Sequence, residues 1–136
     1  MAEATLRIGS SVATLELVRP RIMLVDDEVE QSHLRACIIA SCGYQVITAH
    51  DPFLAIRLAA DEALDLAVLD YEMPGMNASM LADRLRATMP ALKIALYSGM
   101  VAIPESDIGK VDLFISKAGG IFELLRCISD LLKPEH

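Results

Sequence analysis

Four short apolar runs constrain the fold more than any other feature of this sequence. They are residues 22–25 (IMLV), 66–69 (LAVL), 94–97 (IALY) and 113–115 (LFI), and each gives way to polar residues within two positions of its end. Continuous apolar runs of this length are typical of parallel strands that are buried on both faces. Residues 44–49 (YQVITA) also have the composition of a strand. The sequence therefore predicts five strands, most of them buried.

The segments between these strands have the apolar spacing of helices. Asp51 before Pro52 predicts one helix start, and Asn77 predicts another. Pro104 and Gly109 leave room only for a short, irregular helix between residues 100 and 111. The side chains that we expect to face the core recur every three or four positions: Leu34, Cys37, Ile38 and Ser41; Phe53, Ile56 and Ala60; Leu81, Leu85 and Thr88; Ile121, Leu124, Leu125, Ile128, Leu131 and Leu132.

Strands that alternate with helices predict an α/β domain with a doubly wound parallel sheet and helices on both faces. The chain has 136 residues, which suffices for one domain. We assign residues 21–133 to this domain and residues 1–20 to an N-terminal extension. Short apolar–polar alternations in the extension leave three forms open: a hairpin, an ordered segment or a tail.

Charge and composition exclude several classes of partner and location. The net charge is −7 and no run of Lys or Arg occurs, so direct binding to nucleic acid or to an anionic membrane is disfavoured. The sequence shows neither a signal-peptide pattern nor an apolar run of the roughly 20 residues that span a bilayer. We therefore expect a cytoplasmic protein, with Cys37, Cys42 and Cys127 as reduced thiols in the core. His33 and His50 each stand alone in the sequence and do not predict a metal site.

The polar residues that follow the strands carry the chemistry. They are Asp26 and Asp27, Asp70, Ser98 and Lys117. Ligands of doubly wound sheets bind beyond the carboxyl ends of the strands, so these side chains are expected to converge. Any one of them alone is explained as a cap or turn residue. Three carboxylates, one hydroxyl and one ammonium in this joint pattern indicate a functional site.

Crowded carboxylates repel each other, and a divalent cation relieves that repulsion. Hard oxygen ligands suit Mg²⁺, or Mn²⁺ as a substitute. A metal in this position neutralises the oxygens of an incoming phosphoryl group, which Asp70 can attack in line. Lys117 adds a compact positive charge, and Ser98 adds a hydrogen-bond donor.

The runs IMLVDDE, LAVLDYEMPGM, ALYSG and FISKAGG resemble, in order and nearly in spacing, those of a bacterial response-regulator receiver domain. The resemblance covers residues 21–132 and implies a flavodoxin-like sheet with strand order 2-1-3-4-5. It implies that Asp70 is the phosphoacceptor and that Asp27, Asp70 and the backbone carbonyl of Glu72 bind Mg²⁺. Asp26 is then expected to hold a metal-bound water.

The resemblance also implies a switch and a set of partners. Lys117 is expected to pair with the phosphoryl group, while Ser98 and Phe114 match the switch hydroxyl and the switch aromatic. The phosphoryl donor is expected to be a sensor histidine kinase or a histidine phosphotransfer protein. Because the chain ends soon after the last helix, we expect a stand-alone regulator that acts on a downstream protein target; homodimer formation stays open.

One departure from the family affects the site. Ala118 follows Lys117 where the family usually has a proline after a cis peptide bond. A cis bond before a residue other than proline costs ~2.5–4 kcal/mol, so the sequence leaves cis and trans open.

Two other functions are weighed against the phosphorylated switch. A receiver-like interaction module that acts without phosphorylation would fit the irregular segment after Ser98, but the intact acidic set opposes it. A small phosphatase with an aspartyl nucleophile would need Asp-x-Asp after the first strand, whereas Asp26 is followed two positions later by Glu28. We therefore expect Mg²⁺-dependent self-phosphorylation and self-dephosphorylation, but no catalytic turnover of a separate substrate.

Overall fold

Five parallel strands form the central sheet of the computed structural model, which describes residues 3–8, 11–16, 19–100 and 103–134. The strands are β3 (Arg21–Val25), β4 (Gln45–Ala49), β5 (Leu66–Asp70), β6 (Lys93–Ser98) and β7 (Leu113–Ser116). Their order across the sheet is β4-β3-β5-β6-β7. Counted along the sheet-forming part of the chain this order is 2-1-3-4-5, so the predicted doubly wound fold is confirmed.

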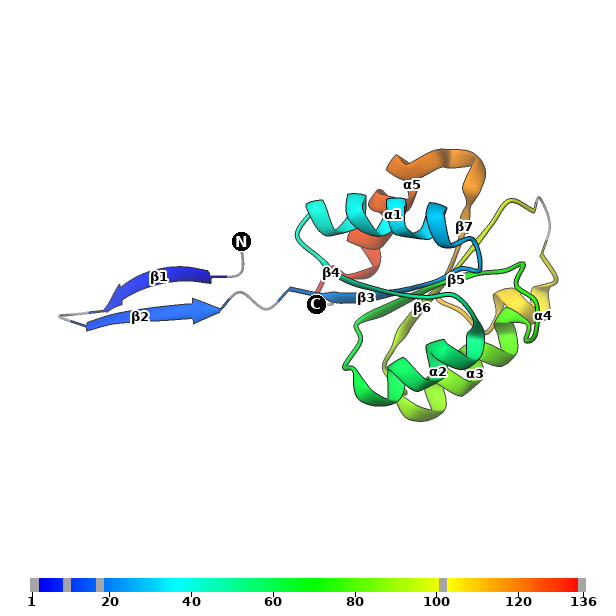
Figure 1. The fold of residues 1–136 in the computed structure, drawn as a ribbon, viewed down its shortest axis with the longest axis horizontal. Helices are drawn as coiled ribbons and strands as arrows, with labels where there is room; N and C mark the ends of the chain where they lie inside the picture. The colour runs from blue at the N-terminus through cyan, green and yellow to red at the C-terminus, as the bar shows by residue number, and fades with distance from the viewer. Residues whose placement is uncertain (1–2, 9–10, 17–18, 101–102, 135–136) are drawn as a thin grey trace.

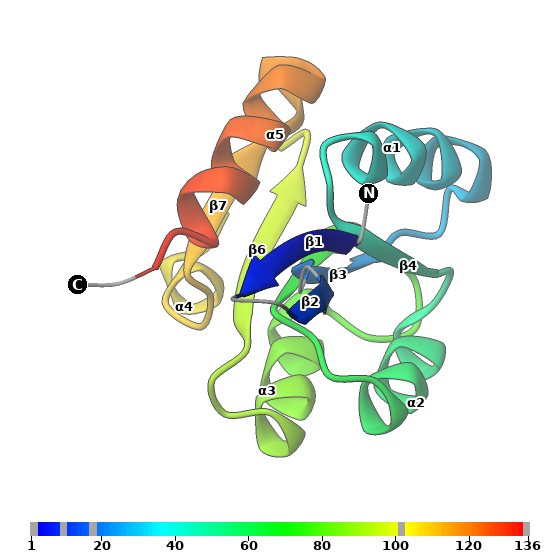
Figure 2. The same cartoon turned by 90° about the vertical axis from the view of Figure 1, so that its left-hand side faces the viewer.

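Helices cover both faces of this sheet, as Figures 1 and 2 show. One face carries α1 (Val29–Ser41) and α5 (Gly120–Leu131), and the other carries α2 (Pro52–Asp61) and α3 (Ala78–Thr88). The short helix α4 (Glu105–Ile108) lies between β6 and β7 in the chain, and a 3₁₀ turn, η1 (Lys117–Gly119), leads into α5. The predicted short fourth helix is therefore confirmed.

Two apolar cores, one on each face of the sheet, explain the continuous apolar runs. In β3, Met23 and Val25 belong to the core under α2 and α3, whereas Ile22 and Leu24 belong to the core under α1 and α5. All five residues of β5 are buried. A central strand with helices on both sides has no solvent face, so neither set of alternating side chains can be polar.

Side-chain caps begin two of the helices as the sequence predicts. The Asp51 carboxylate accepts a hydrogen bond from the backbone N–H of Leu54 at 2.8 Å, and Pro52 occupies the first turn of α2. The Asn77 side chain accepts one from the N–H of Met80 at 2.9 Å and starts α3. Each cap satisfies an N–H group that has no partner within its helix.

The predicted inner face of α1 is wrong by part of a turn. Leu34 is 64% exposed and Cys37 is exposed, while Ser32 and Ile39 are buried. The inner face of α1 includes polar side chains near the strand ends. The positions of the apolar residues in this helix therefore do not identify its inner face. Ser41 is also exposed, and only Ile38 of the predicted set is half-buried.

The predicted inner face of α2 is right for Ile56, which packs half-buried against the core, but wrong for the other two residues of the set. Phe53 is 57% exposed and Ala60 is exposed, whereas Pro52, Ala55 and Ala59 are buried. Small side chains on the inner face allow α2 to pack closely, so the larger apolar residues lie at its edge. In α3, Leu81 and Leu85 are buried as predicted, but Thr88 is exposed. In α5, Leu124 and Ile128 are buried as predicted.

The cysteines do not share one environment. All three are free thiols; Cys127 is buried, whereas Cys37 and Cys42 are exposed. The prediction of core cysteines is therefore wrong for Cys37 and Cys42, since Cys37 lies on the outer face of α1 and Cys42 follows its last turn.

Polar side chains hold α4 and the residues after it against α3. Asp107 of α4 accepts hydrogen bonds from the Tyr71 hydroxyl at 2.6 Å and from the Ser79 hydroxyl. Farther along, Lys110 pairs with Asp83 at 2.8 Å. Arg86 pairs with Asp112 at 2.6 Å. A helix of four residues has few internal hydrogen bonds, so these external contacts fix its position.

The N-terminal residues form a separate two-stranded sheet. Strand β1 (Glu3–Ile8) pairs antiparallel with β2 (Ser11–Glu16), and Figure 1 shows this hairpin apart from the main sheet. Residues 9 and 10, between these two strands, lie outside the described residues. The boundary between residues 20 and 21 stays a prediction. Within the described part of the chain, no helix is long and apolar enough to cross a membrane.

Two substitutions in α1 test the corrected helix face. Ile39→Ala removes a side chain with 0% exposure and should lower the free energy of unfolding by about 2–5 kcal/mol. Leu34→Ala removes a side chain on the outer face and should change it by less than about 0.5 kcal/mol. Urea unfolding of both variants at one pH measures the difference. A loss for Leu34→Ala as large as that for Ile39→Ala would contradict the described face.

Candidate functional site

Three carboxylates meet at the carboxyl edge of the sheet. Asp26 and Asp27 follow β3, and Asp70 ends β5, the strand beside it. Each contributes an oxygen to a group whose atoms all lie within 4.8 Å of one another. Asp26 and Asp70 are 5% and 4% exposed, whereas Asp27 is exposed. The predicted convergence of these three side chains is therefore present in the structure.

Asp26 is held at both of its carboxylate oxygens. Its Oδ1 accepts a hydrogen bond from the backbone N–H of Glu28 at 2.9 Å. Its Oδ2 accepts one from Nη1 of Arg35 in α1 at 3.0 Å. The N–H of Asp26 itself donates to the carbonyl oxygen of Ala49 at the end of β4, at 3.0 Å. These contacts fix the position of the carboxylate relative to two strands and one helix.

Asp70 lies between a negative and a positive neighbour. Its Oδ1 accepts hydrogen bonds from Nζ of Lys117 at 3.2 Å and from the backbone N–H of Glu72 at 3.3 Å. Burial, together with the charge of Asp26, raises the pKa of the Asp70 carboxyl from 3.8 to about 6. Lys117 and the Glu72 N–H oppose that rise in pKa. The carboxylate is therefore costly to ionise and would gain from a further positive charge.

The Lys117 side chain contacts Asp70 although the peptide bond that follows Lys117 is trans. The described residues contain no cis peptide bond, so the Lys117–Ala118 bond is trans. Lys117 begins the turn η1, in which the Ser116 hydroxyl oxygen accepts a hydrogen bond from the Ala118 N–H at 3.2 Å. This turn takes the place of the proline-containing loop that the resemblance implied, and the contact with Asp70 is kept.

Ser98 and Phe114 lie where the sequence placed them, at the end of β6 and within β7. Ser98 is fully buried; its hydroxyl donates to Oε1 of Glu72 at 3.3 Å and accepts from the N–H of Met100 at 3.0 Å. The first of these bonds links Ser98 to Glu72, whose backbone N–H contacts Asp70. Phe114 is half-buried and packs against the core under α2 and α3.

Arg35 and Tyr97 belong to this region but were missed by sequence reasoning. The Tyr97 ring is 5% exposed, with the Arg35 guanidinium 5.2 Å and the Lys117 ammonium 5.4 Å from its centroid. Tyr97 reads as the last residue of an apolar strand, and Arg35 as a surface residue of a helix. No local sequence pattern singles out Arg35.

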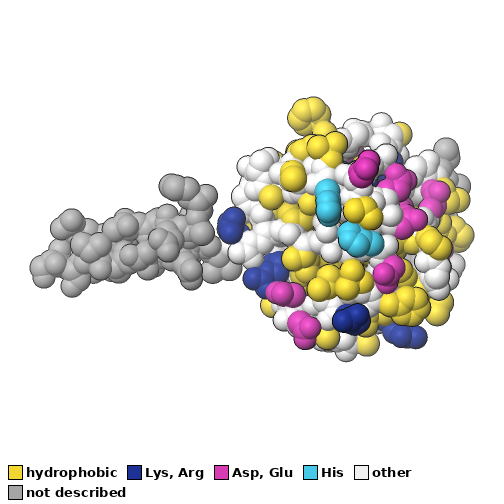
Figure 3. All heavy atoms as spheres, in the orientation of Figure 1, with side chains coloured by type: hydrophobic (Ala, Val, Ile, Leu, Met, Phe, Trp, Pro, Cys, Tyr) yellow, Lys and Arg dark blue, Asp and Glu magenta, His cyan; other side chains and the backbone are white. Residues whose placement is uncertain are grey.

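His33 and His50 are close in space although they are far apart in the sequence. Their ring centroids are 6.1 Å apart, and Figure 3 shows two neighbouring histidine side chains on this face. The expectation that each stands alone is therefore wrong in three dimensions. His33 is exposed on α1 and His50 follows β4, as the surface or loop placement predicts. Among the described residues, the group of three possible metal ligands is the carboxylate cluster.

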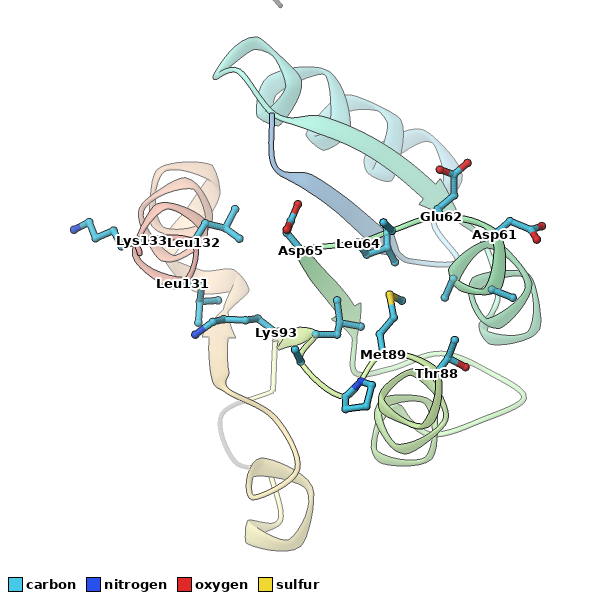
Figure 4. Close-up of a pocket in the computed structure, with 16 residues that line it drawn as sticks. Asp61, Glu62, Leu64, Asp65, Thr88, Met89, Lys93, Leu131, Leu132 and Lys133 are labelled. Carbon is cyan, nitrogen blue, oxygen red and sulfur yellow. The ribbon is translucent and has the colours of Figure 1, made fainter. Parts of the chain in front are cut away.

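A larger groove lies at the opposite edge of the sheet. Its volume is about 840 Å³, and it is lined by the C-terminal ends of α2, α3 and α5 with the loops beside them (Figure 4). Two acidic residues of this groove serve structural contacts: Glu62 pairs with Arg21 at 2.7 Å, and Asp65 accepts from the Arg21 N–H at 2.8 Å. No residue of the carboxylate cluster lines it, so the groove and the candidate site are separate.

Comparison with known proteins agrees with this arrangement. A family described as the response regulator receiver domain matches residues 22–125. The response regulator MprA of Mycobacterium avium (strain 104) is 32% identical over 123 residues, covering 85% of this chain and 53% of MprA. A protein-glutamate methylesterase/protein-glutamine glutaminase of Anaeromyxobacter dehalogenans is 33% identical over 100 residues, covering 69% of this chain and 28% of that protein. The chain thus spans about half or less of these relatives.

A solved structure shows the same fold. The response regulator TrrA of Thermotoga maritima in complex with Mg²⁺-BeF superimposes with a TM-score of 0.76 at 27% identity, covering 83% of this chain and 99% of TrrA. TrrA has also been solved in complex with the histidine kinase ThkA. The family match covers most of the chain, including both strands that carry the acidic cluster. The chain therefore belongs to the response regulator receiver domain family of two-component signalling.

Proposed function

We propose that this chain is a phosphorylation-dependent switch that accepts a phosphoryl group on Asp70. The observation that carries the proposal is the position of Asp70, buried between Asp26 and Lys117 with the backbone N–H of Glu72 on the same oxygen. The Asp70 carboxylate supplies the nucleophilic oxygen. A phosphohistidine P–N bond breaks as the P–O bond forms, and the imidazole leaves with a proton.

The acidic cluster fits a divalent cation. Asp26, Asp27 and Asp70 offer only hard oxygen ligands within 4.8 Å of one another. Mg²⁺ prefers such ligands, keeps several waters and is replaced most readily by Mn²⁺. We assign direct binding to Asp27, Asp70 and the backbone carbonyl of Glu72, and a water-mediated contact to Asp26. When bound, the ion supplies positive charge to the oxygens of the incoming phosphoryl group.

The protein's own residues complete the acceptor. Lys117 already contacts Asp70 at 3.2 Å, so its ammonium is in place to pair with a phosphoryl oxygen. The Ser98 hydroxyl exchanges its hydrogen bond with Glu72 for one with the phosphoryl group. The Phe114 side chain then rotates into the space that Ser98 leaves at the end of β6. Phosphorylation adds up to about one further negative charge and strong acceptor oxygens, which is the input for this rearrangement.

The proposed donor is a sensor histidine kinase or a histidine phosphotransfer protein. Supporting this, the related regulator TrrA forms a complex with the histidine kinase ThkA. The chain catalyses its own phosphorylation and dephosphorylation without turning over another substrate. Its output is a contact with a downstream protein. An interaction module that works without phosphorylation is the alternative, and the first experiment below separates the two.

Acetyl phosphate tests the acceptor directly. Wild-type protein incubated with acetyl phosphate and Mg²⁺ should gain the mass of one phosphoryl group in intact mass spectrometry. Asp70→Asn should gain none, because the amide lacks the nucleophilic oxygen. Asp65→Asn, at the opposite edge of the sheet, is the control for a lost carboxylate and should be phosphorylated like the wild type. No mass gain in the wild type, or an equal gain in Asp70→Asn, would contradict the proposed function.

The raised pKa of Asp70 predicts a pH-dependent effect on stability. In the unfolded chain this carboxyl ionises near its ordinary value of 3.8, and in the folded protein near 6. Ionisation therefore opposes folding: the penalty is absent below pH ~4, grows between pH 4 and 6, and is complete above that range. Two pKa units correspond to at most about 3 kcal/mol.

Asp70→Asn removes this penalty. Without metal at pH 7.5 the variant should be more stable than the wild type by about 1–3 kcal/mol, and the difference should vanish near pH 4. Adding Mg²⁺ should stabilise the wild type and leave Asp70→Asn nearly unchanged. Urea unfolding with EDTA at both pH values measures the difference in stability between the variant and the wild type. Repeating it with Mg²⁺ measures how much the metal stabilises each protein. A variant less stable than the wild type at pH 7.5 would contradict the described electrostatics.

A further inference from the structure

Arg35 gives the acidic site a counter-ion that belongs to the protein itself. It extends from α1, and its Nη1 donates to Oδ2 of Asp26 at 3.0 Å. The Arg35 side chain is 20% exposed and that of Asp26 is 7% exposed. A pair this shielded from water interacts more strongly than a surface ion pair.

Two further contacts hold Arg35 in this position. Its guanidinium lies 5.2 Å from the centroid of the Tyr97 ring, which is itself buried. Its Nη2 donates to Oε1 of Gln31, one turn earlier in α1, at 3.2 Å. The guanidinium is therefore fixed beside Asp26 and is not a mobile surface charge.

Arg35 also faces the acceptor side of the site. A small cavity is lined by Asp26, Arg35 and Asp70, together with Ser32 and Tyr97. The charges on Arg35 and on the two carboxylates thus meet across a narrow space partly lined by apolar side chains, where screening between them is weak.

We propose that Arg35 is a positioning residue that lowers the affinity of the acidic site for Mg²⁺. The inference rests on the proposed function, because it concerns the same metal site. Both oxygens of Asp26 are engaged, one by Glu28 and one by Arg35, so this carboxylate is held as a partner for a metal-bound water. The positive charge of Arg35 repels a cation that enters beside Asp26.

Two effects of removing Arg35 oppose each other. Loss of the guanidinium frees Asp26 to move, which weakens a water-mediated contact. It also removes a positive charge held 3.0 Å from a carboxylate of the cluster, close enough to repel a cation bound there. Because the Glu28 N–H continues to hold Oδ1, the electrostatic effect dominates. Removal of Arg35 is therefore expected to tighten Mg²⁺ binding.

Mg²⁺ titration of Arg35→Gln tests the proposal without any phosphoryl donor. Isothermal calorimetry at pH 8 should show a Kd for Mg²⁺ about five- to fiftyfold lower than in the wild type. Thermal unfolding provides a second readout: metal-free Arg35→Gln should melt below the wild type, and Mg²⁺ should raise its Tm by more. A role in packing alone would not tighten metal binding.

Three further variants complete the design. Arg35→Lys keeps the charge and should keep a Kd within about threefold of the wild type. Arg35→Met keeps an apolar stem beside Tyr97 without charge, and replaces Arg35→Gln if that variant does not fold. Arg57→Gln loses one charge from the exposed side of α2, across the sheet, and should bind Mg²⁺ like the wild type.

The outcomes separate this proposal from the proposed function. Unchanged or weaker Mg²⁺ binding by Arg35→Gln and Arg35→Met overturns the role of Arg35, even if acetyl phosphate modifies Asp70. Tighter binding supports it, even if no phosphorylation occurs. Equal tightening in Arg57→Gln would reduce the effect to net charge and would also overturn it. Absence of Mg²⁺ binding in every variant overturns the proposal.

Discussion

The crowding of Asp26, Asp27 and Asp70 at one edge of the sheet is the interaction on which the rest of the site depends. Two of these carboxylates are almost fully buried, and burial with mutual repulsion makes the ionised form of Asp70 costly. Lys117 offsets that cost directly at Asp70, while Arg35 pairs with the neighbouring carboxylate of Asp26. The site is thus destabilised by repulsion between carboxylates. Binding of a cation or protonation of a carboxylate reduces that repulsion.

The parallel sheet produces this crowding. Strands β3 and β5 are neighbours, with Val25 beside Leu69, so the residues that follow them leave the sheet at the same edge. The two apolar cores hold these strands rigidly and prevent the carboxylates from moving apart. Burial of the strands therefore keeps the carboxylates close enough to repel each other. The stability of the rest of the fold offsets the free-energy cost of that repulsion.

Much of the site was predictable because it depends on where strands end. A buried strand is a continuous apolar run, so Asp26, Asp70 and Ser98 mark strand ends in the sequence itself. The inner faces of α1 and α2 were not predictable in the same way. Ile39 shares the inner face of α1 with the polar residues Ser32 and Arg35, and small alanines mark that of α2. Hydrophobic periodicity identifies a helix face only where large apolar side chains occupy it.

The contacts of α4 were not predictable from the sequence either, because no local sequence pattern indicates them. Tyr71, the residue after Asp70, donates its backbone N–H to the carbonyl of Tyr97 at 3.2 Å and its hydroxyl to Asp107. The hydrogen bond from Ser79 to Asp107, followed by that from Tyr71, lowers the pKa of the Asp107 carboxyl and keeps it a charged acceptor. One side chain thus connects the loop after β5 to α4. A displacement of α4 that keeps this hydrogen bond must move Tyr71, and with it the backbone beside Asp70.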